Sequence, residues 1–128
     1  MTNRSFRCLF FFVFCCSGLF GFGKEVVKIS TSPAKQGIAV NFSIDRGYGI
    51  QRDARNKVDL IYLTGKNKHT VKRFTGNVSS EDDRYYNTLN SINIPYDSIS
   101  PAELNVLFYY CQFKNKFCGV QKSKINLP

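Results

Sequence analysis

The chain has 128 residues, a formal net charge of +9 at pH 7 and 43% hydrophobic residues. This length suits one domain with its own core, and the positive charge raises the question of a nucleic-acid partner. The basic residues, however, are scattered in ones and twos, as at Lys66, Lys68, Lys72 and Arg73. Because no glycine-aromatic RNA-binding motif, zinc-ligand spacing or basic helix accompanies them, we predict no nucleic-acid partner. The charge is interpreted as a solvated basic surface that favours acidic partners or envelopes.

The first 23 residues have the pattern of a secretory signal peptide. Arg4 and Arg7 precede the apolar run CLFFFVFCCSGLFGFG, which ends with glycines at the positions that signal peptidase prefers. The run is shorter than the ~20 residues that a membrane-spanning helix needs. We therefore predict a signal peptide over residues 1–23 and a mature domain over residues 24–128. The mature protein would be periplasmic or secreted, without stable membrane insertion, although a retained anchor is an alternative.

The mature domain reads as a series of short β-strands. Ile38, Val40, Phe42 and Ile44 alternate with more polar residues, which is the period-two pattern of a half-buried strand. Similar stretches predict strands over residues 26–30, 38–44, 58–62, 71–74, 92–96, 104–110, 120–122 and 125–127. Turn-forming residues separate them at positions 32–33, 46–47, 65–67, 76–77 and 100–101. Since no apolar helical period persists for three turns, the pattern predicts an all-β, antiparallel β-sandwich.

Removal of the leader takes away Cys8, Cys15 and Cys16 and leaves Cys111 and Cys118. Six residues separate these two, and an even number allows two cysteines to face each other across an antiparallel hairpin. Opposed residues of such a pair have Cα atoms ~4.5 or ~5.5 Å apart, and both separations allow a disulfide. The strand would end at Cys111, with the turn at residues 114–115 or over the wider loop 113–116.

The chemistry of these two cysteines leaves two roles open. A structural bond that closes so short a loop would stabilise the fold by roughly 2.5 kcal/mol. A reversible redox pair is equally compatible with the residues, and the charges of Lys114 and Lys116 would favour a thiolate. We expect Cys118 to be the less hindered sulfur, because Gly119 follows it and Tyr110 precedes Cys111.

Other groups offer weaker candidates for chemistry. His69, the only histidine, lies in a polar stretch without partners at ligand spacing, so we predict no metal site. The acidic run Glu81-Asp82-Asp83 lacks the rhythm of a calcium loop, and no phosphate-binding glycine loop or serine nucleophile elbow occurs. No cofactor is expected.

Three segments resemble the N-terminal domain of the thiol–disulfide interchange protein DsbD and related DsbD-like domains. FYYCQFKNKFCGVQKSKINLP is similar to the end of that domain, where an aromatic strand carries the first cysteine and a short loop leads to the second. IAVNFSIDRGYGIQ resembles its strand and Gly-Tyr turn, and SSEDDRYYNTLNSINIPYD resembles its acidic-aromatic cap loop. The resemblance extends over about residues 26–128.

The resemblance implies an immunoglobulin-like sandwich that exchanges disulfides, in the manner of a protein-disulfide reductase. Its partners would be thioredoxin-fold oxidoreductases and a membrane-embedded electron donor. The resemblance implies that Cys111 and Cys118 are the exchanging pair. It also implies that Asp82, Asp83, Tyr85 and Tyr86 belong to a cap loop that covers this pair. Tyr48 would be the aromatic residue of the turn.

The chain also departs from that family. Gly49 stands where the turn usually carries a histidine, six rather than five residues separate the cysteines, and Gly119 replaces an aromatic residue. The alternative hypothesis is a non-catalytic secreted or envelope binding module, with the same immunoglobulin-like scaffold and a structural disulfide.

Overall fold

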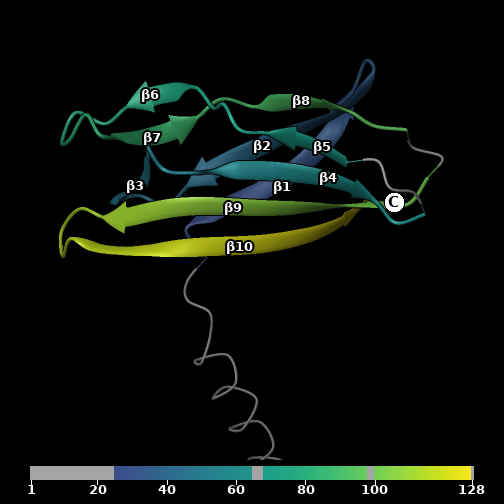
Figure 1. Cartoon of the computed structure of the whole chain (residues 1–128). Coiled ribbons are helices and arrows are strands. Elements are labelled where there is room, and N and C mark those ends of the chain that lie inside the picture. Colours follow the sequence, from purple (N-terminus) through teal and green to yellow (C-terminus); the bar gives the residue numbers. More distant parts are fainter. Residues whose placement is uncertain (1–24, 65–67, 98–99, 128) are drawn as a thin grey trace, which may run out of the picture.

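The computed structural model describes residues 25–64, 68–97 and 100–127, so the predicted signal peptide lies outside the described residues. Those ranges contain ten β-strands and no helix, and every described strand pairing is antiparallel. Two sheets pack against each other (Figure 1). The fold is the predicted all-β, immunoglobulin-like sandwich. Within the described ranges, no helix has the length and apolarity to cross a membrane.

The smaller sheet has the order β1-β2-β8, formed by Val27–Ala34, Gly37–Ile44 and Ile92–Pro95. β1 is longer than predicted and continues through Pro33, which pairs with Ile38. The predicted turn at residues 32–33 is therefore wrong, and the chain reverses at Lys35 and Gln36 instead. Proline is tolerated here because β1 lies at the edge of its sheet, where one side of the backbone needs no partner.

The larger sheet has the order β5-β4-β9-β3-β7-β6, with β10 on the other edge of β9. Its strands are β3 (Tyr48–Gln51), β4 (Lys57–Tyr62), β5 (Lys68–Val71), β6 (Gly76–Val78), β7 (Tyr85–Leu89), β9 (Ala102–Gln112) and β10 (Phe117–Leu127). β10 is one continuous strand where two were predicted. The strand predicted over residues 71–74 is wrong beyond its first residue, because β5 ends at Val71. The sequence pattern missed β3, β6 and β7 because they are short. The predicted turn at residues 76–77 is wrong, since these residues belong to β6.

The long strand β9 carries Cys111 near its end and fixes the position of the neighbouring strands there. One of its edges pairs with β10 over its whole length. The other edge is shared, because β4 pairs with residues 102–107 and β3 with residues 110–112. Asn56 fills the junction: its Nδ2 donates to the Gln51 carbonyl and its Oδ1 accepts from the Tyr109 amide, both at 2.8 Å. This contact positions β3 beside Cys111.

The core follows from the alternation of side chains along β9. Leu104, Val106, Phe108 and Tyr110 point inward and are buried. The ring of Phe108 meets those of Phe42 and Phe74 edge-on, at centroid distances of 5.3 and 5.4 Å. Such aromatic contacts add to the stabilisation that comes from burying apolar surface. The intervening residues of β9, among them Cys111, therefore belong to the outer face.

A buried glutamine joins the two sheets. Gln121 of β10 is only 6% exposed. Its Oε1 accepts from the backbone amides of Val26 and Val27, both at 2.8 Å, and its Nε2 donates to the Val27 carbonyl at 2.8 Å. The start of β1 is thus attached to the hairpin through one side chain whose hydrogen-bonding groups are all used.

Replacement of Gln121 by leucine should lower the free energy of unfolding by ~3 kcal/mol, because buried backbone groups of Val26 and Val27 lose their partners. Urea unfolding measures the change. The neighbouring exposed substitution Lys122→Gln should stay within about 0.5 kcal/mol of the wild type. Equal stability of the two variants would contradict the role assigned to Gln121.

Candidate functional site at the Cys111–Cys118 disulfide

Cys111 and Cys118 are direct partners in the β9–β10 register and form a disulfide, with their Cα atoms 3.9 Å apart. The predicted facing arrangement is confirmed. The turn is the wider of the two alternatives, residues 113–116, and Lys116 adopts a left-handed φ of 55° in it. β9 does not end at Cys111 but continues to Gln112, since the paired register extends to the turn. Both cysteines are therefore inside the ladder.

The two sulfur-bearing residues differ in exposure. Cys111 is 4% exposed, whereas Cys118 is exposed. Cys118 is the more exposed of the two cysteines, as predicted, but shielding of Cys111 by Tyr110 is not the reason. Successive strand residues point to opposite faces, so Tyr110 lies on the other side of β9 from Cys111. Tyr110 instead packs over Gly119, where a Cβ would lie only 2.7 Å from its hydroxyl oxygen.

The neighbouring strand β3 covers Cys111. Gly49 is its direct partner across the β3–β9 pairing. Two residues further along the same face, Gln51 directs its Nε2 to the Sγ of Cys111 at 3.4 Å. Gln51 is not among the residues predicted from the sequence, where its only signal is its place at the end of the Gly-Tyr segment. A side-chain amide therefore lies against the buried sulfur.

Gly49 leaves space for an aromatic pair. A Cβ at this position would lie 2.6 Å from the Phe113 ring and 2.7 Å from Cβ of Tyr85. The rings of Phe113 and Tyr85 meet edge-on at 5.5 Å. A histidine at this position would collide with them in this arrangement. Gly49 therefore allows Phe113 of the hairpin turn and Tyr85 of β7 to pack over it, and these two rings form a cover beside Cys111.

The structure brings the predicted aromatic residues to this end of the sheet, but not as a loop. Tyr85 and Tyr86 are the first residues of β7, and Tyr48 is the first residue of β3. Tyr48 accepts a hydrogen bond from Gln112 at 3.4 Å and meets the Tyr110 ring at 5.9 Å. Tyr86 donates to the Phe74 carbonyl at 3.1 Å. Of the three, Tyr85 forms part of the cover over Gly49, beside the disulfide.

The two aspartates lie in the turn that precedes β7. Asp82 accepts from the Arg84 guanidinium at 2.7 and 3.0 Å, and the Asp83 carbonyl accepts from Arg52 at 2.6 Å. The hydrogen bonds from Arg84 lower the pKa of Asp82 to about 2, with a smaller contribution from the charge of Lys116.

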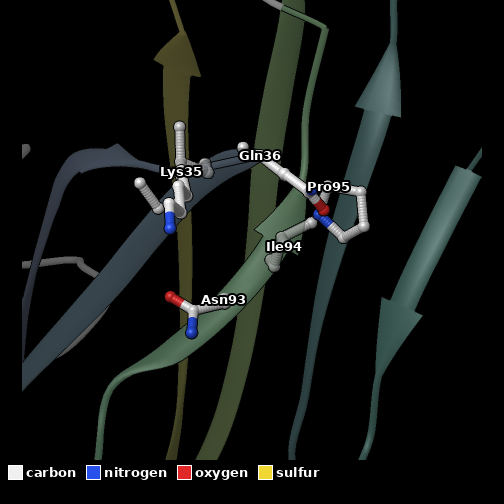
Figure 2. A pocket seen from close by; sticks show the side chains of 8 residues that line it. Lys35, Gln36, Asn93, Ile94 and Pro95 are labelled. Carbon is white, nitrogen blue, oxygen red and sulfur yellow. The ribbon is translucent and has the colours of Figure 1, made fainter.

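Among the described residues, neither His69 nor the hollow beside β8 forms a second chemical site. His69 lies exposed in β5 opposite Leu60, and no group of three potential metal ligands occurs in the described ranges. A hollow of about 460 Å³ lies between the β1–β2 turn and β8 (Figure 2). Lys35, Gln36, Asn93 and Pro95 line it, and its lining includes no cysteine, histidine or carboxylate.

The fold and site define an immunoglobulin-like sandwich with a half-exposed disulfide across two antiparallel strands. No family model, curated protein or solved structure matches this chain. The resemblance to the DsbD N-terminal domain therefore stays a prediction from the sequence motifs.

The pKa of Asp82 provides a test of the acidic turn. We expect its carboxyl group to titrate near pH 2, as followed by carboxyl-carbon NMR. Because the folded pKa lies below the ordinary value of 3.8, the pairing stabilises the fold above about pH 4 and is lost as pH falls through 2. Arg84→Gln should raise the pKa part of the way to 3.8, because the backbone amide of residue 84 still donates to Asp82, and Lys116→Gln should move it less. An unchanged pKa in Arg84→Gln would refute the assigned cause.

Proposed function

We propose that this protein is an exported thiol–disulfide exchange protein that relays reducing equivalents to envelope oxidoreductases through Cys111 and Cys118. The observation that carries the proposal is the unequal exposure of the two cysteines. Exchange requires a thiolate to reach one sulfur along the line of the bond, while the other sulfur leaves. Cys118 is exposed and would be the sulfur that the thiolate reaches. Cys111 is buried with an amide donor beside it and would be the sulfur that leaves.

The proposed reaction begins when a thiolate of a reduced donor attacks the Sγ of Cys118. The Cys111–Cys118 bond breaks, its electron pair passes to Cys111, and a mixed disulfide joins the donor to Cys118. The second thiol of the donor then attacks the donor sulfur of this bond, so that the donor leaves as a disulfide and the pair as a dithiol. In the forward step, Cys118 attacks the disulfide of an oxidised partner and Cys111 resolves the product.

Gln51 has a proposed part in this reaction. Its amide donates to Cys111, and hydrogen bonds to charged groups are stronger than those between neutral groups. The bond therefore becomes stronger as negative charge develops on the leaving sulfur, and a better-stabilised thiolate leaves faster. Gln51 is a positioning and stabilising residue for Cys111.

The residues around the pair are proposed to restrict access to it. Phe113 and Tyr85 cover Gly49 beside Cys111, and the turn with Asp82 and Asp83 precedes Tyr85. Tyr48 and Tyr86 support the neighbouring strands. Such a cover would leave Cys118 as the point of contact for thioredoxin-fold partners and for a membrane donor, and would slow reaction at Cys111.

A second candidate is a secreted or envelope binding module in which the bond is structural. The position of both cysteines inside a continuous ladder favours it, because a disulfide there reinforces existing strand pairing. The two functions differ in reduction potential, since structural bonds of exported proteins typically lie below about −300 mV and exchange couples above it.

The main test is equilibration of the purified mature protein in glutathione redox buffers. We expect a Cys111–Cys118 potential less negative than about −300 mV, with the fold retained in the reduced form by circular dichroism. A bond that resists mild dithiol at neutral pH, while the fold stays intact, would favour the structural role.

Single cysteine variants test which sulfur is attacked. Cys111→Ser should form mixed disulfides through Cys118 readily, whereas Cys118→Ser should react at least roughly tenfold more slowly because Cys111 is buried. Mass spectrometry after reaction with an oxidised glutathione probe measures both. Faster capture of Cys111 would reverse the proposed order.

Gln51→Leu tests the stabilisation of the leaving sulfur. Loss of one hydrogen bond to a charged group should slow reduction by dithiothreitol roughly tenfold. In the Cys118→Ser background, the same change should raise the pKa of Cys111, followed by thiolate absorbance. Gln112→Leu is the control, because that amide contacts Tyr48 and Asn115 rather than sulfur. An unchanged Cys111 pKa in Gln51→Leu would remove this role.

A further inference from the structure

On the outer face of the larger sheet, the strand register places the disulfide at one end of a series of partly or fully exposed side chains. Residues two apart on a strand point to the same side. The pair Cys111–Cys118 is thus followed by the pair Tyr109–Val120, and then by Leu107 with Lys57 on one side and Lys122 on the other. Leu107 is four residues from Cys111 along β9, which corresponds to about 13 Å at ~3.3 Å per residue.

The part of this face nearest the disulfide is apolar. Val120 is 45% exposed, Cys118 is exposed and Tyr109 is half-buried. An exposed valine beside a reachable sulfur gives a partner apolar surface to bury next to the reacting atoms.

The far part of the same face is basic and hollowed. One hollow of about 510 Å³ has Arg55, Lys57 and Lys72 around Leu107 and Tyr109. A second, of about 420 Å³, shares Lys57 and Leu107 with the first and adds Lys122 and Lys124. These cations come from three separate segments of the chain, which is why they look scattered in the sequence.

The carboxylates near this face are already engaged. Asp59 accepts from Thr70 at 2.6 Å and pairs with Lys57 at 3.5 Å, and Glu103 pairs with Lys124 at 3.9 Å. Arg55, Lys72 and Lys122 are exposed, and within the described ranges none of them forms an ion pair. The face therefore presents uncompensated positive charge beside an apolar strip and an exposed cysteine.

We propose that this face, defined by Cys118, Val120, Tyr109, Leu107 and the surrounding Arg55, Lys57, Lys72 and Lys122, is the docking surface for a protein whose reactive cysteine has acidic surroundings. The proposal rests on the proposed function and names the class of its partner. Complementary charge raises the rate of encounter and fixes orientation, while the apolar strip acts at contact. A protein partner is favoured over a nucleic acid because the strip that adjoins the cations is apolar.

Docking can be measured without any exchange of disulfides. The probes are two fluorescent peptides of equal length, one with aspartates and leucines around a central serine and one with lysines in place of the aspartates. We expect the acidic peptide to bind the oxidised mature protein, by fluorescence anisotropy, at least tenfold more tightly than the basic one. Raising the salt concentration from 50 to 500 mM should weaken this binding several-fold.

Two charge-matched double variants locate the surface. Lys72→Gln with Lys122→Gln should weaken binding of the acidic peptide at least fivefold. Lys28→Gln with Lys35→Gln removes the same charge from β1 and the β1–β2 turn of the other sheet and should change it less than twofold. Neither double variant removes an ion pair described in the structure, so both should unfold at the same urea concentration as the wild type.

The outcomes separate docking from exchange. Equal loss in both double variants would mean that only net charge matters, and would overturn the proposed surface. Tighter binding of a charge-matched oligonucleotide through Lys72 and Lys122 would overturn the protein partner. With cysteine in place of serine, the acidic peptide should form a mixed disulfide with Cys118, with release of the Cys111 thiolate, faster than the basic peptide. Reduction by dithiothreitol should show no difference between the double variants. A bond inert to both thiols would refute exchange while leaving the anisotropy result to decide docking.

Discussion

The division of one edge of β9 between two strands is the constraint on which the rest of the site depends. β4 occupies the first part of that edge and β3 the last, and Asn56 satisfies the backbone at the junction. Because β3 begins a new pairing there, Gly49 and Gln51 come beside Cys111. β3 thus covers Cys111 from one side, whereas Cys118 lies on β10, which pairs with β9 alone among the described strands. The asymmetry of the two sulfurs is thus a consequence of strand order (Figure 1).

Alternation along β9 explains how one strand serves both the core and the candidate site. Phe108 and Tyr110 point inward, where Phe108 packs against Phe42 and Phe74, while Tyr109 and Cys111 face outward. A shift of one residue in the β9–β10 register would exchange the two faces and break the core. The core therefore fixes the position of the sulfurs.

Much of the fold could be predicted from the sequence, since period-two apolar patterns marked β2, β4, β8 and β9, and even spacing indicated the opposed cysteines. The polar residues that organise the structure could not be predicted. Gln121 acts on Val26 and Val27, and Asn56 on Tyr109, across long sequence separations. β3 and β7 were missed because such short segments become strands only when longer strands supply their partners. The basic face likewise exists only once the register aligns Lys57 with Leu107 and Lys122.

The same geometry that makes the disulfide useful as a staple also suits the proposed exchange. β9 and β10 pair over eleven residues each, and their ladder extends far beyond Cys111 and Cys118. A bond that closes so short a loop contributes only ~2.5 kcal/mol, which is small beside the pairing and core contacts of the hairpin. Reduction would therefore leave the two thiols facing each other in the register of the oxidised protein. Little chain entropy would have to be lost again for the bond to re-form, because the folded hairpin already holds the thiols together.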